Sequence, residues 1–313
     1  MEIVEVTSDF YSHFIAHPYH FFNSANFNSL NANKCEKVLY WLFREGKYRL
    51  GIIVGLKSNT ILSPFSAPFG CFSYLDAKIK IDHIEKAVDE IVQKCRGMGI
   101  YSISLTLPPI FYDESFITKI INCLFRKNFS IKIIDLNYAL NLNHFNDQYV
   151  NNIWYNARKN LKISLSKEFE FLKCGDNHQK HQAYEIIKYN REKRGFPLRM
   201  TWEQVLETVS VIQADFFLVK DSMQQDIASA IVFHVKEREI AQVIYWGDKP
   251  EYSENKTMNY LSFKVFEYYK QEGFKYVDIG PSSENSLPNY GLCDFKESIG
   301  CSISPKITMM YQA

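Results

Sequence analysis

The chain has 313 residues, which is enough for two domains of ordinary size with a core each. Hydrophobic residues make up 46% of it and charged residues 23%, a composition that is typical of globular proteins and excludes a disordered chain. Lys and Arg number 36 and Asp and Glu 35, so the net charge of +1 argues against a dedicated binder of nucleic acid or anionic membranes, although it leaves room for a local basic patch.

The seven cysteines are scattered and include no C-x-x-C pair, so we expect buried thiols in a reducing compartment and neither a disulfide frame nor a zinc site. Glu2 and Glu5 stand where a signal peptide needs positive charge, and no apolar stretch approaches the ~18 residues of a membrane helix. We therefore expect a cytoplasmic protein without membrane insertion. The histidines lack the spacing of a metal site with a third ligand, so no metal is expected.

The first half opens with an aromatic stretch, residues 1–33, for which we expect short helices and no strand. Asp82 and Glu85 have the spacing of a capping box at the start of a helix with one apolar face. Alternation, helical spacing and Gly/Pro punctuation predict the following order after residue 33: strands 38–44, 48–55 and 60–65, a helix from 82, a strand 100–107, a helix 114–127 and a strand 131–140.

The second half repeats this order after an additional helix. The predicted elements are a helix 146–166, a strand 169–173, helices 178–194 and 202–212, strands 215–220, 227–235 and 240–245, a helix 256–271, a strand 275–279, a helix 292–298 and a strand 302–311. The strand 240–245 leads through a polar loop into the helix from Lys256. The first turn of a helix has unpaired N–H groups, so this turn is a candidate site for a phosphorylated ligand.

Corresponding positions in the two halves are separated by nearly the same number of residues. The glycines that end the central helices, Gly99 and Gly273, are 174 residues apart, and the starts of the last strands, Ile131 and Ile303, are 172 apart. A shared offset with matching element order predicts two similar α/β domains, 1–142 and 143–313, each with a mixed sheet. No G-x-G-x-x-G follows a leading strand, so a Rossmann fold is not predicted.

Four segments carry a family resemblance. The run YYKQEGFKYVDIG (268–280) is similar to a helix–Gly–strand motif, and GLCDFKESIG (291–300) is similar to a Gly-Leu-x-x-Phe-Lys-x-x-Phe-Gly block, with Ile299 in place of its second Phe. The basic helix 156–162 and the opening segment 17–24 are also similar to the corresponding segments of that family. These motifs resemble the Fem-type family, which includes peptidoglycan peptidyltransferases and related bacterial acyltransferases built from two GNAT-like domains. The Gly-rich phosphate loop of ordinary acetyltransferases is missing.

The resemblance implies direct attack of an amine on an acyl donor, without a metal or a covalent nucleophile. It places the carbonyl oxygen at backbone N–H groups around Tyr245, where the strand before the central helix separates from its neighbour. It also implies that Lys296 reaches the cleft and steadies an oxyanion or a donor phosphate. At a strand end Asp278 would orient the amine or accept its proton, with Glu284 as a rival, and Tyr290 would protonate the leaving group. The alternatives are a surface lysine, a turn-capping carboxylate and packing aromatics.

The donor phosphates are expected at residues of the loop before the central helix, namely Trp246, Gly247, Asn255, Lys256 and Thr257. Arg158 begins a basic stripe on its helix that suits a substrate phosphate or carboxylate, unless it is a solvated face. A second basic cluster, 189–195, suits acceptor binding. We interpret Cys293 and Cys301 as buried structural thiols and His234 as a core histidine.

The chain is thus expected to be an N-acyltransferase that moves an acyl group from an acyl-CoA-type donor to an amine of a small molecule or sugar nucleotide, in cell-envelope or polysaccharide synthesis by analogy. Two alternatives stay open: a Fem-type aminoacyltransferase that uses aminoacyl-tRNA as donor, and a catalytically inactive ligand-binding module.

Overall fold

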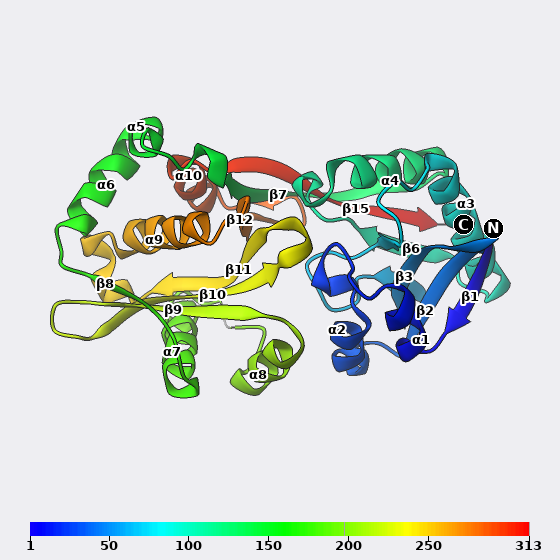
Figure 1. The fold of residues 1–313 in the computed structure, drawn as a ribbon, viewed down its shortest axis with the longest axis horizontal. Coiled ribbons are helices and arrows are strands. Elements are labelled where there is room, and N and C mark those ends of the chain that lie inside the picture. Colours follow the sequence, from blue (N-terminus) through cyan, green and yellow to red (C-terminus); the bar gives the residue numbers. More distant parts are fainter. Residues whose placement is uncertain (197, 313) are drawn as a thin grey trace. The chain divides into compact units, whose positions relative to one another are not determined.

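The computed structural model describes residues 1–313 apart from Pro197 and Ala313. The described residues form two compact units, of which unit 1 holds residues 1–136, 283–287 and 304–312 and unit 2 holds residues 137–282 and 288–303. The strands β7 (Ser130–Asn141) and β15 (Ser302–Gln312) give residues to both units. Figure 1 shows the elements of each unit in chain order.

Unit 1 is a sheet with the strand order β1-β2-β3-β4-β6-β15-β7, and β5 lies beside β3. Its strands are β1 (Glu2–Val6), β2 (Lys37–Glu45), β3 (Lys47–Lys57), β4 (Thr60–Ser63), β5 (Phe72–Tyr74) and β6 (Ser102–Thr106), and its longer helices are α1 (Ser8–Phe14), α2 (Ala25–Leu30), α3 (Ile81–Gly97) and α4 (Glu114–Arg126). A buried apolar cluster with Tyr11, Leu42 and Ile53 joins α1 to β2 and β3. In this unit β4 and β6 pair in parallel, and α3 connects them.

Unit 2 has the strand order β7-β12-β11-β10-β9-β8. Its strands are β8 (Glu170–Lys173), β9 (Ala214–Lys220), β10 (Asp226–Val235), β11 (Ile240–Asp248) and β12 (Tyr276–Pro281), and its helices are α5 (Tyr149–Asn152), α6 (Tyr155–Leu165), α7 (Asn177–Lys193), α8 (Trp202–Val211), α9 (Thr257–Gln271) and α10 (Tyr290–Ser298). A short ladder of β13 (Ser283–Glu284) and β14 (Leu287–Pro288) follows β12. Here β11 and β12 are the parallel pair, and α9 connects them.

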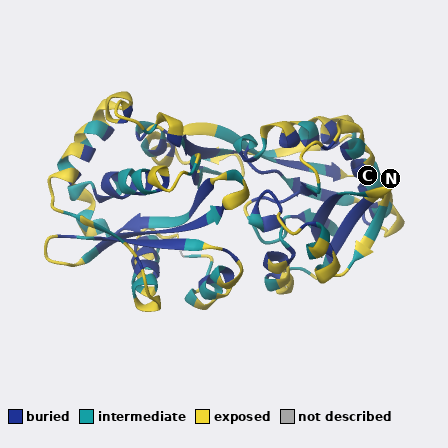
Figure 2. Ribbon diagram, viewed as in Figure 1, coloured by how far each residue is buried: buried dark blue, intermediate teal, exposed yellow. Residues whose placement is uncertain are grey.

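The sheet of unit 2 has helices on both faces. α7 packs on β9, β10 and β11, and α9 packs on β10 and β11 from the other side, as Figure 1 shows. The side chains confirm this division, because the Ser229 hydroxyl of β10 donates to the Ala183 carbonyl of α7 at 2.6 Å, whereas His234 of the same strand contacts Tyr269 of α9. The buried residues in Figure 2 follow the strands and the inner sides of these helices. Both units thus have the mixed α/β sheet that the sequence predicts.

Three sequence predictions need correction. The capping box of Asp82 and Glu85 is wrong, because α3 begins after Lys80 without a side-chain cap and Glu85 binds Arg126 instead. The helix expected over 146–166 is broken at Ile153, where the amide of Trp154 donates to the Ser298 carbonyl rather than continuing the helix. The opening segment contains a strand, β1, which pairs along β2 and was not predicted.

Candidate functional site: an opening between two parallel strands

The parallel strands β11 and β12 separate after a short run of pairing. They pair only at Ile240 with Tyr276, Ala241 with Val277 and Gln242 with Asp278. On the opposite side of β11 the register with β10 shifts at Ile244, which marks a β-bulge. From residue 243 onward no described strand lies on the β12 side of β11, so peptide groups that would belong to a ladder are left without strand partners. The predicted separation at residues 244–246 is confirmed.

Side chains alternate across the sheet at this opening. A Cβ on Gly247 would lie 2.9 Å from the Asn190 side chain of α7, so Gly247 faces α7, and Tyr245, two residues earlier, shares that face. Trp246 between them faces α9. Gln242 pairs with Phe233, next to the α9-facing His234, which places Gln242 on the α7 face as well. The opening is therefore flanked on the α7 face by Tyr245 and Gln242.

Two arginines surround Tyr245 on this face. Arg191 from the last turn of α7 and Arg199 from the following loop both interact electrostatically with the Tyr245 phenol, and the backbone of Arg199 bonds to it. Burial raises the pKa of Tyr245 above its usual value, with the two arginines opposing. The phenol is therefore protonated at neutral pH and can serve as a hydrogen-bond donor.

Arg191 has an electrostatic environment that favours an anion. Burial lowers the pKa of its guanidinium, Tyr245 opposes this, and the positive charges of Arg194 and Arg199 add to it. Among the described residues no carboxylate forms an ion pair with Arg191. A half-buried guanidinium without a negative partner costs desolvation energy that a bound phosphate or carboxylate would offset. Arg191 is thus the least exposed basic residue of the cluster 189–195. The spacing of residues in the sequence did not distinguish it from the others.

Lys296 is buried and does not reach an open cleft, contrary to what the resemblance implied. Its ammonium lies 2.8 Å from the carbonyls of Ile279 and Gly280 and 3.0 Å from that of Pro281, so its three N–H donors all meet carbonyls at the end of β12. The side chain is 2% exposed. Burial lowers the pKa of Lys296 to about 8, while Asp278 opposes this and Arg191 adds to it. Lys296 fixes the strand end that borders the opening.

Asp278 is fully buried beside this lysine. Its Oδ1 accepts hydrogen bonds from Asn137 of β7 at 2.8 Å and from the amide of Gly280 at 2.9 Å. The carboxylate thus shapes the turn after β12, as the turn-capping alternative proposed. Its lateral neighbour Gln242 is 4% exposed, and its Oε1 accepts no hydrogen bond from the described part of the chain. Gln242 was not predicted as a site residue, because a glutamine within an apolar strand belongs to no motif.

The predicted donor loop is mostly engaged in packing. The Thr257 hydroxyl is buried and donates to the Tyr252 carbonyl at 3.0 Å, and Gly247 makes room for Asn190. Lys256 is the N-cap of α9 in a left-handed conformation, with φ of 58° and no side-chain cap, and Asn255 ends the preceding 3-10 turn. The backbone start of α9 therefore stays a candidate for a phosphate, whereas the side chain of Thr257 is occupied.

The remaining predicted residues, Tyr290, Glu284 and Arg158, differ in how far they are buried. Tyr290 is 76% exposed at the start of α10. Glu284 is exposed and belongs to unit 1. Arg158 on α6 is half-buried, and its Nε is enclosed without a hydrogen-bond partner in the described residues.

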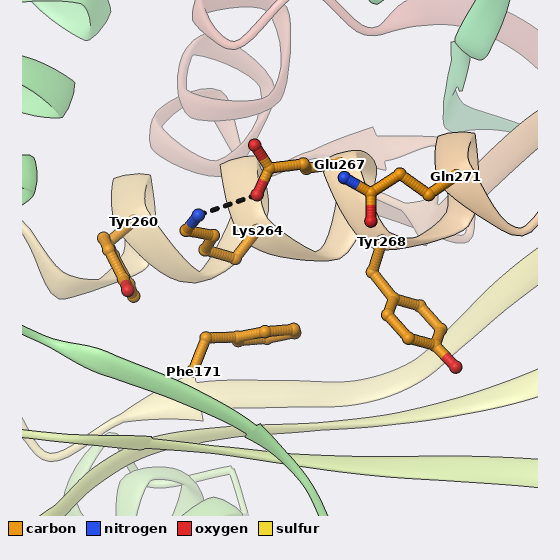
Figure 3. A pocket seen from close by; sticks show the side chains of 6 residues that line it. All are labelled: Phe171, Tyr260, Lys264, Glu267, Tyr268 and Gln271. Carbon is orange, nitrogen blue, oxygen red and sulfur yellow. Dashed lines mark hydrogen bonds and ion pairs between the residues drawn. The ribbon is translucent and has the colours of Figure 1, made fainter.

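Two hollows in unit 2 are lined by described residues, among which Tyr189 of the basic cluster 189–195 is the one that the sequence predicted for a site. One, of about 200 Å³, lies between Phe171 of β8 and the side of α9 that carries Tyr260, Tyr268 and the ion pair of Lys264 with Glu267 (Figure 3). The other, of about 520 Å³, is lined by α7 residues such as Tyr189 and by Lys249. They are distinct from the opening between β11 and β12, because no residue of the opening lines either one.

Over the described part of the chain no group of three or more His, Cys, Asp or Glu side chains could hold a metal ion, and no helix is long and apolar enough to cross a membrane. Cys293 and Cys301 are buried, and burial raises the pKa of Cys301, so a thiolate nucleophile is not favoured there. His234 lies 2.8 Å from the Asp215 carboxylate inside the core, which confirms its predicted role as a satisfied core histidine.

No protein-family model and no curated protein matches this chain. Among solved structures, FemX is similar at 13% identity with a TM-score of 0.71, over 100% of this chain and 98% of FemX. L-PGS from Bacillus licheniformis is 12% identical with a TM-score of 0.63, over 98% and 92% of the two chains. A tandem GNAT protein from the clavulanic acid biosynthesis pathway is 8% identical with a TM-score of 0.53, over 99% and 98%. The chain has the tandem GNAT-like fold of Fem-type proteins.

Proposed function

We propose that this protein is an acyltransferase whose reaction takes place at the opening between β11 and β12. The observation that carries the proposal is the end of strand pairing at Gln242 and Asp278, next to a β-bulge at Ile244. Amide groups released there can donate to the oxygen of a carbonyl that becomes negative as an amine attacks it. Such preorganised donors commonly contribute about 3–4 kcal/mol to lowering the barrier.

The acceptor is an amine on a small molecule or sugar nucleotide that carries a phosphate or carboxylate. Arg191 and Arg199 beside Tyr245 support this class, because they gather positive charge on the face of the opening without a carboxylate bound to Arg191. In the reaction the amine nitrogen bonds to the acyl carbon, the bond to the leaving group breaks, the amine loses a proton and the leaving group gains one. We assign the supply of that proton to the protonated Tyr245 phenol.

An acyl-CoA-type thioester is the proposed donor. The start of α9 supports it, since Lys256 caps the helix without using its side chain, and the first-turn amides other than that of Asn259 can meet a phosphate. A link to cell-envelope or polysaccharide synthesis would follow from analogy alone.

An aminoacyl-tRNA is the second candidate donor, and two observations favour it. The Gly-rich phosphate loop is missing, and Gly247 and Thr257, which stand in its place, are engaged in packing. The Fem-type resemblance of the sequence implies the same donor class.

The test is a transfer assay with both donors. The purified protein is mixed with acetyl-CoA or with a pool of aminoacyl-tRNAs and with an amino sugar nucleotide, and the amide product is detected by mass spectrometry. We expect product with one donor, and Arg191→Gln to raise KM for the phosphorylated acceptor about 10- to 100-fold. Lys193→Gln, which removes an exposed charge two residues away, is the matched control and should leave KM unchanged. Donor binding without transfer to any amine would favour an inactive binding module.

A further inference from the structure

The outer side of α6 combines exposed aromatic and basic side chains. Ala157, Leu161 and Ser164 form its buried side, which packs towards α9 and α10. Tyr155, Lys159 and Lys162 follow one another at spacings of four and three residues on the opposite side, so they share one outward line. Figure 2 shows exposed residues along this helix. We call Trp154, Tyr155, Lys159, Lys162 and Leu165 the α6 surface.

The α6 surface carries positive charge that the described residues do not neutralise. From residue 148 to residue 167 the sequence has four basic residues and no acidic one. None of these four forms an ion pair within the described chain, whereas some exposed lysines elsewhere do, such as Lys86 with Glu45 and Lys37 with Glu5. In a protein of net charge +1, this is a local excess that attracts an anionic partner.

The apolar members of the α6 surface indicate which anionic partner fits. Trp154 is 50% exposed, Tyr155 73% and Leu165 47%, and they lie at the two ends of the basic line. Tryptophan and tyrosine favour the headgroup region of a bilayer, where a ring is partly in hydrocarbon and its polar atom stays hydrated. Leu165 gains from contact with acyl chains and gains little from a phosphodiester backbone.

We propose that the α6 surface docks this protein peripherally onto an anionic phospholipid membrane. The two lysines attract lipid phosphates, and the aromatic rings and Leu165 lie at the headgroup level, with α6 parallel to the bilayer plane. This contact needs no membrane-spanning segment. It is a separate proposal from the donor and acceptor above, because none of these five residues is among those on which they rest.

Vesicle sedimentation tests the proposal with the full chain. We expect the protein to bind vesicles of phosphatidylcholine that contain phosphatidylglycerol, and to bind pure phosphatidylcholine weakly, because anionic headgroups attract the lysines. The double variant Lys159→Gln/Lys162→Gln should lower the partition coefficient about 10- to 30-fold. The matched control Lys78→Gln/Lys80→Gln removes two exposed charges from unit 1 and should have no such effect.

The fluorescence of Trp154 gives a second readout that charge alone would not change. Brominated lipids should quench tryptophan emission in the wild-type protein and not in Trp154→Phe, because Trp41 is fully buried and Trp202 and Trp246 are half-buried on other elements. Circular dichroism and thermal unfolding of each variant confirm that it folds.

Three results would overturn the proposal. They are an absence of binding to anionic vesicles, equal loss of binding in the Lys78/Lys80 control, and quenching that persists in Trp154→Phe. Binding of unacylated tRNA that the α6 variants abolish, without vesicle binding, would assign the same surface to RNA instead.

Discussion

Lys296 shows how a residue in a motif can have a role other than the one its motif implies. Its ammonium is saturated by three carbonyls at the end of β12, so replacement disturbs the strand end before it disturbs any substrate. Loss of activity in variants of Lys296 or of the buried Asp278 would therefore report on the shape of the opening. Contact between a side chain and the substrate is tested instead by substituting a residue that faces the opening.

The buried ammonium predicts a pH dependence of stability. The pKa of Lys296 is lowered to about 8 from 10.5, so between these pH values the unfolded chain holds a proton that the folded chain has released. Stability conferred by this position therefore rises with pH across that window, by up to about 3 kcal/mol. We expect the free energy of unfolding of wild type minus that of Lys296→Met, measured in urea, to grow from pH 7.5 to pH 9.5. A difference that does not change with pH would contradict this assignment.

Asp215 is the centre of a second buried network, on the α9 face. It accepts from Lys173 at 2.8 Å, lies 2.8 Å from His234 and accepts from Tyr269 at 3.1 Å. Burial alone would raise the pKa of this carboxyl, but the hydrogen bonds of His234 and Lys173 outweigh it and lower the pKa. Its contribution to stability is thus present above the ordinary carboxyl pKa of about 3.9 and is lost as the pH falls through the folded value.

Asp215→Asn should therefore destabilise the protein by about 2–4 kcal/mol at pH 7, with the deficit shrinking in acid. Urea unfolding at pH 7 and at pH 3.5 measures both values. The exposed Asp147→Asn is the matched control, for which we expect less than about 0.5 kcal/mol at either pH. An equal loss of unfolding free energy at both pH values would show that the charge of the Asp215 carboxylate does not stabilise the network.

At the scale of elements, the contact of α7 with β11 sets one wall of the opening. Gly247 approaches Asn190 so closely that a Cβ would lie 2.9 Å from its side chain, and the Asn190 amide donates to the Asp248 carbonyl at 2.5 Å. This contact holds Arg191, the next residue of α7, beside Tyr245.

Gly247→Ala should destabilise the protein by about 1–3 kcal/mol, because either α7 or β11 must shift to admit the methyl group. Thermal unfolding measures the loss. Gly97→Ala, at the end of α3 with open space around its Cβ, is the control and should be neutral or slightly stabilising. An equal change in thermal stability in the two variants would contradict the claim that Gly247 is needed for the close packing of α7 on β11.

Helices and strands with a single strong local pattern were predicted correctly from the sequence. Elements whose bounds depend on tertiary contacts were not. The hairpin of β2 and β3 and the helix α4 follow from alternation, a short Gly turn and helical spacing. The break at Ile153 depends on the Trp154 amide finding the Ser298 carbonyl, which is 144 residues away and leaves no local signal. The strand β1 forms because β2 offers it an edge, and its five residues resemble a polar terminus in isolation.

At the scale of the whole molecule, the repeat of element order could be predicted from the sequence. Each unit contains one parallel pair of strands, and a helix connects the two strands of that pair. In unit 1 that helix is α3 between β4 and β6, and in unit 2 it is α9 between β11 and β12. The site was readable only in part. The position of the separation follows from the fold, whereas Gln242 could be recognised only from the register of the sheet and Arg191 only from its interaction with Tyr245.

Hydrogen exchange of the β11 amides tests the central claim most directly. Without ligand, the amides of residues 243–245 that face β12 should exchange faster than those of residues 240–242, because only the latter lie in the parallel ladder. Addition of whichever acyl donor supports transfer should slow exchange at residues 243–245. Full protection of these amides in the free protein, or donor-induced protection confined to another element, would contradict an acyl-transfer site at the opening.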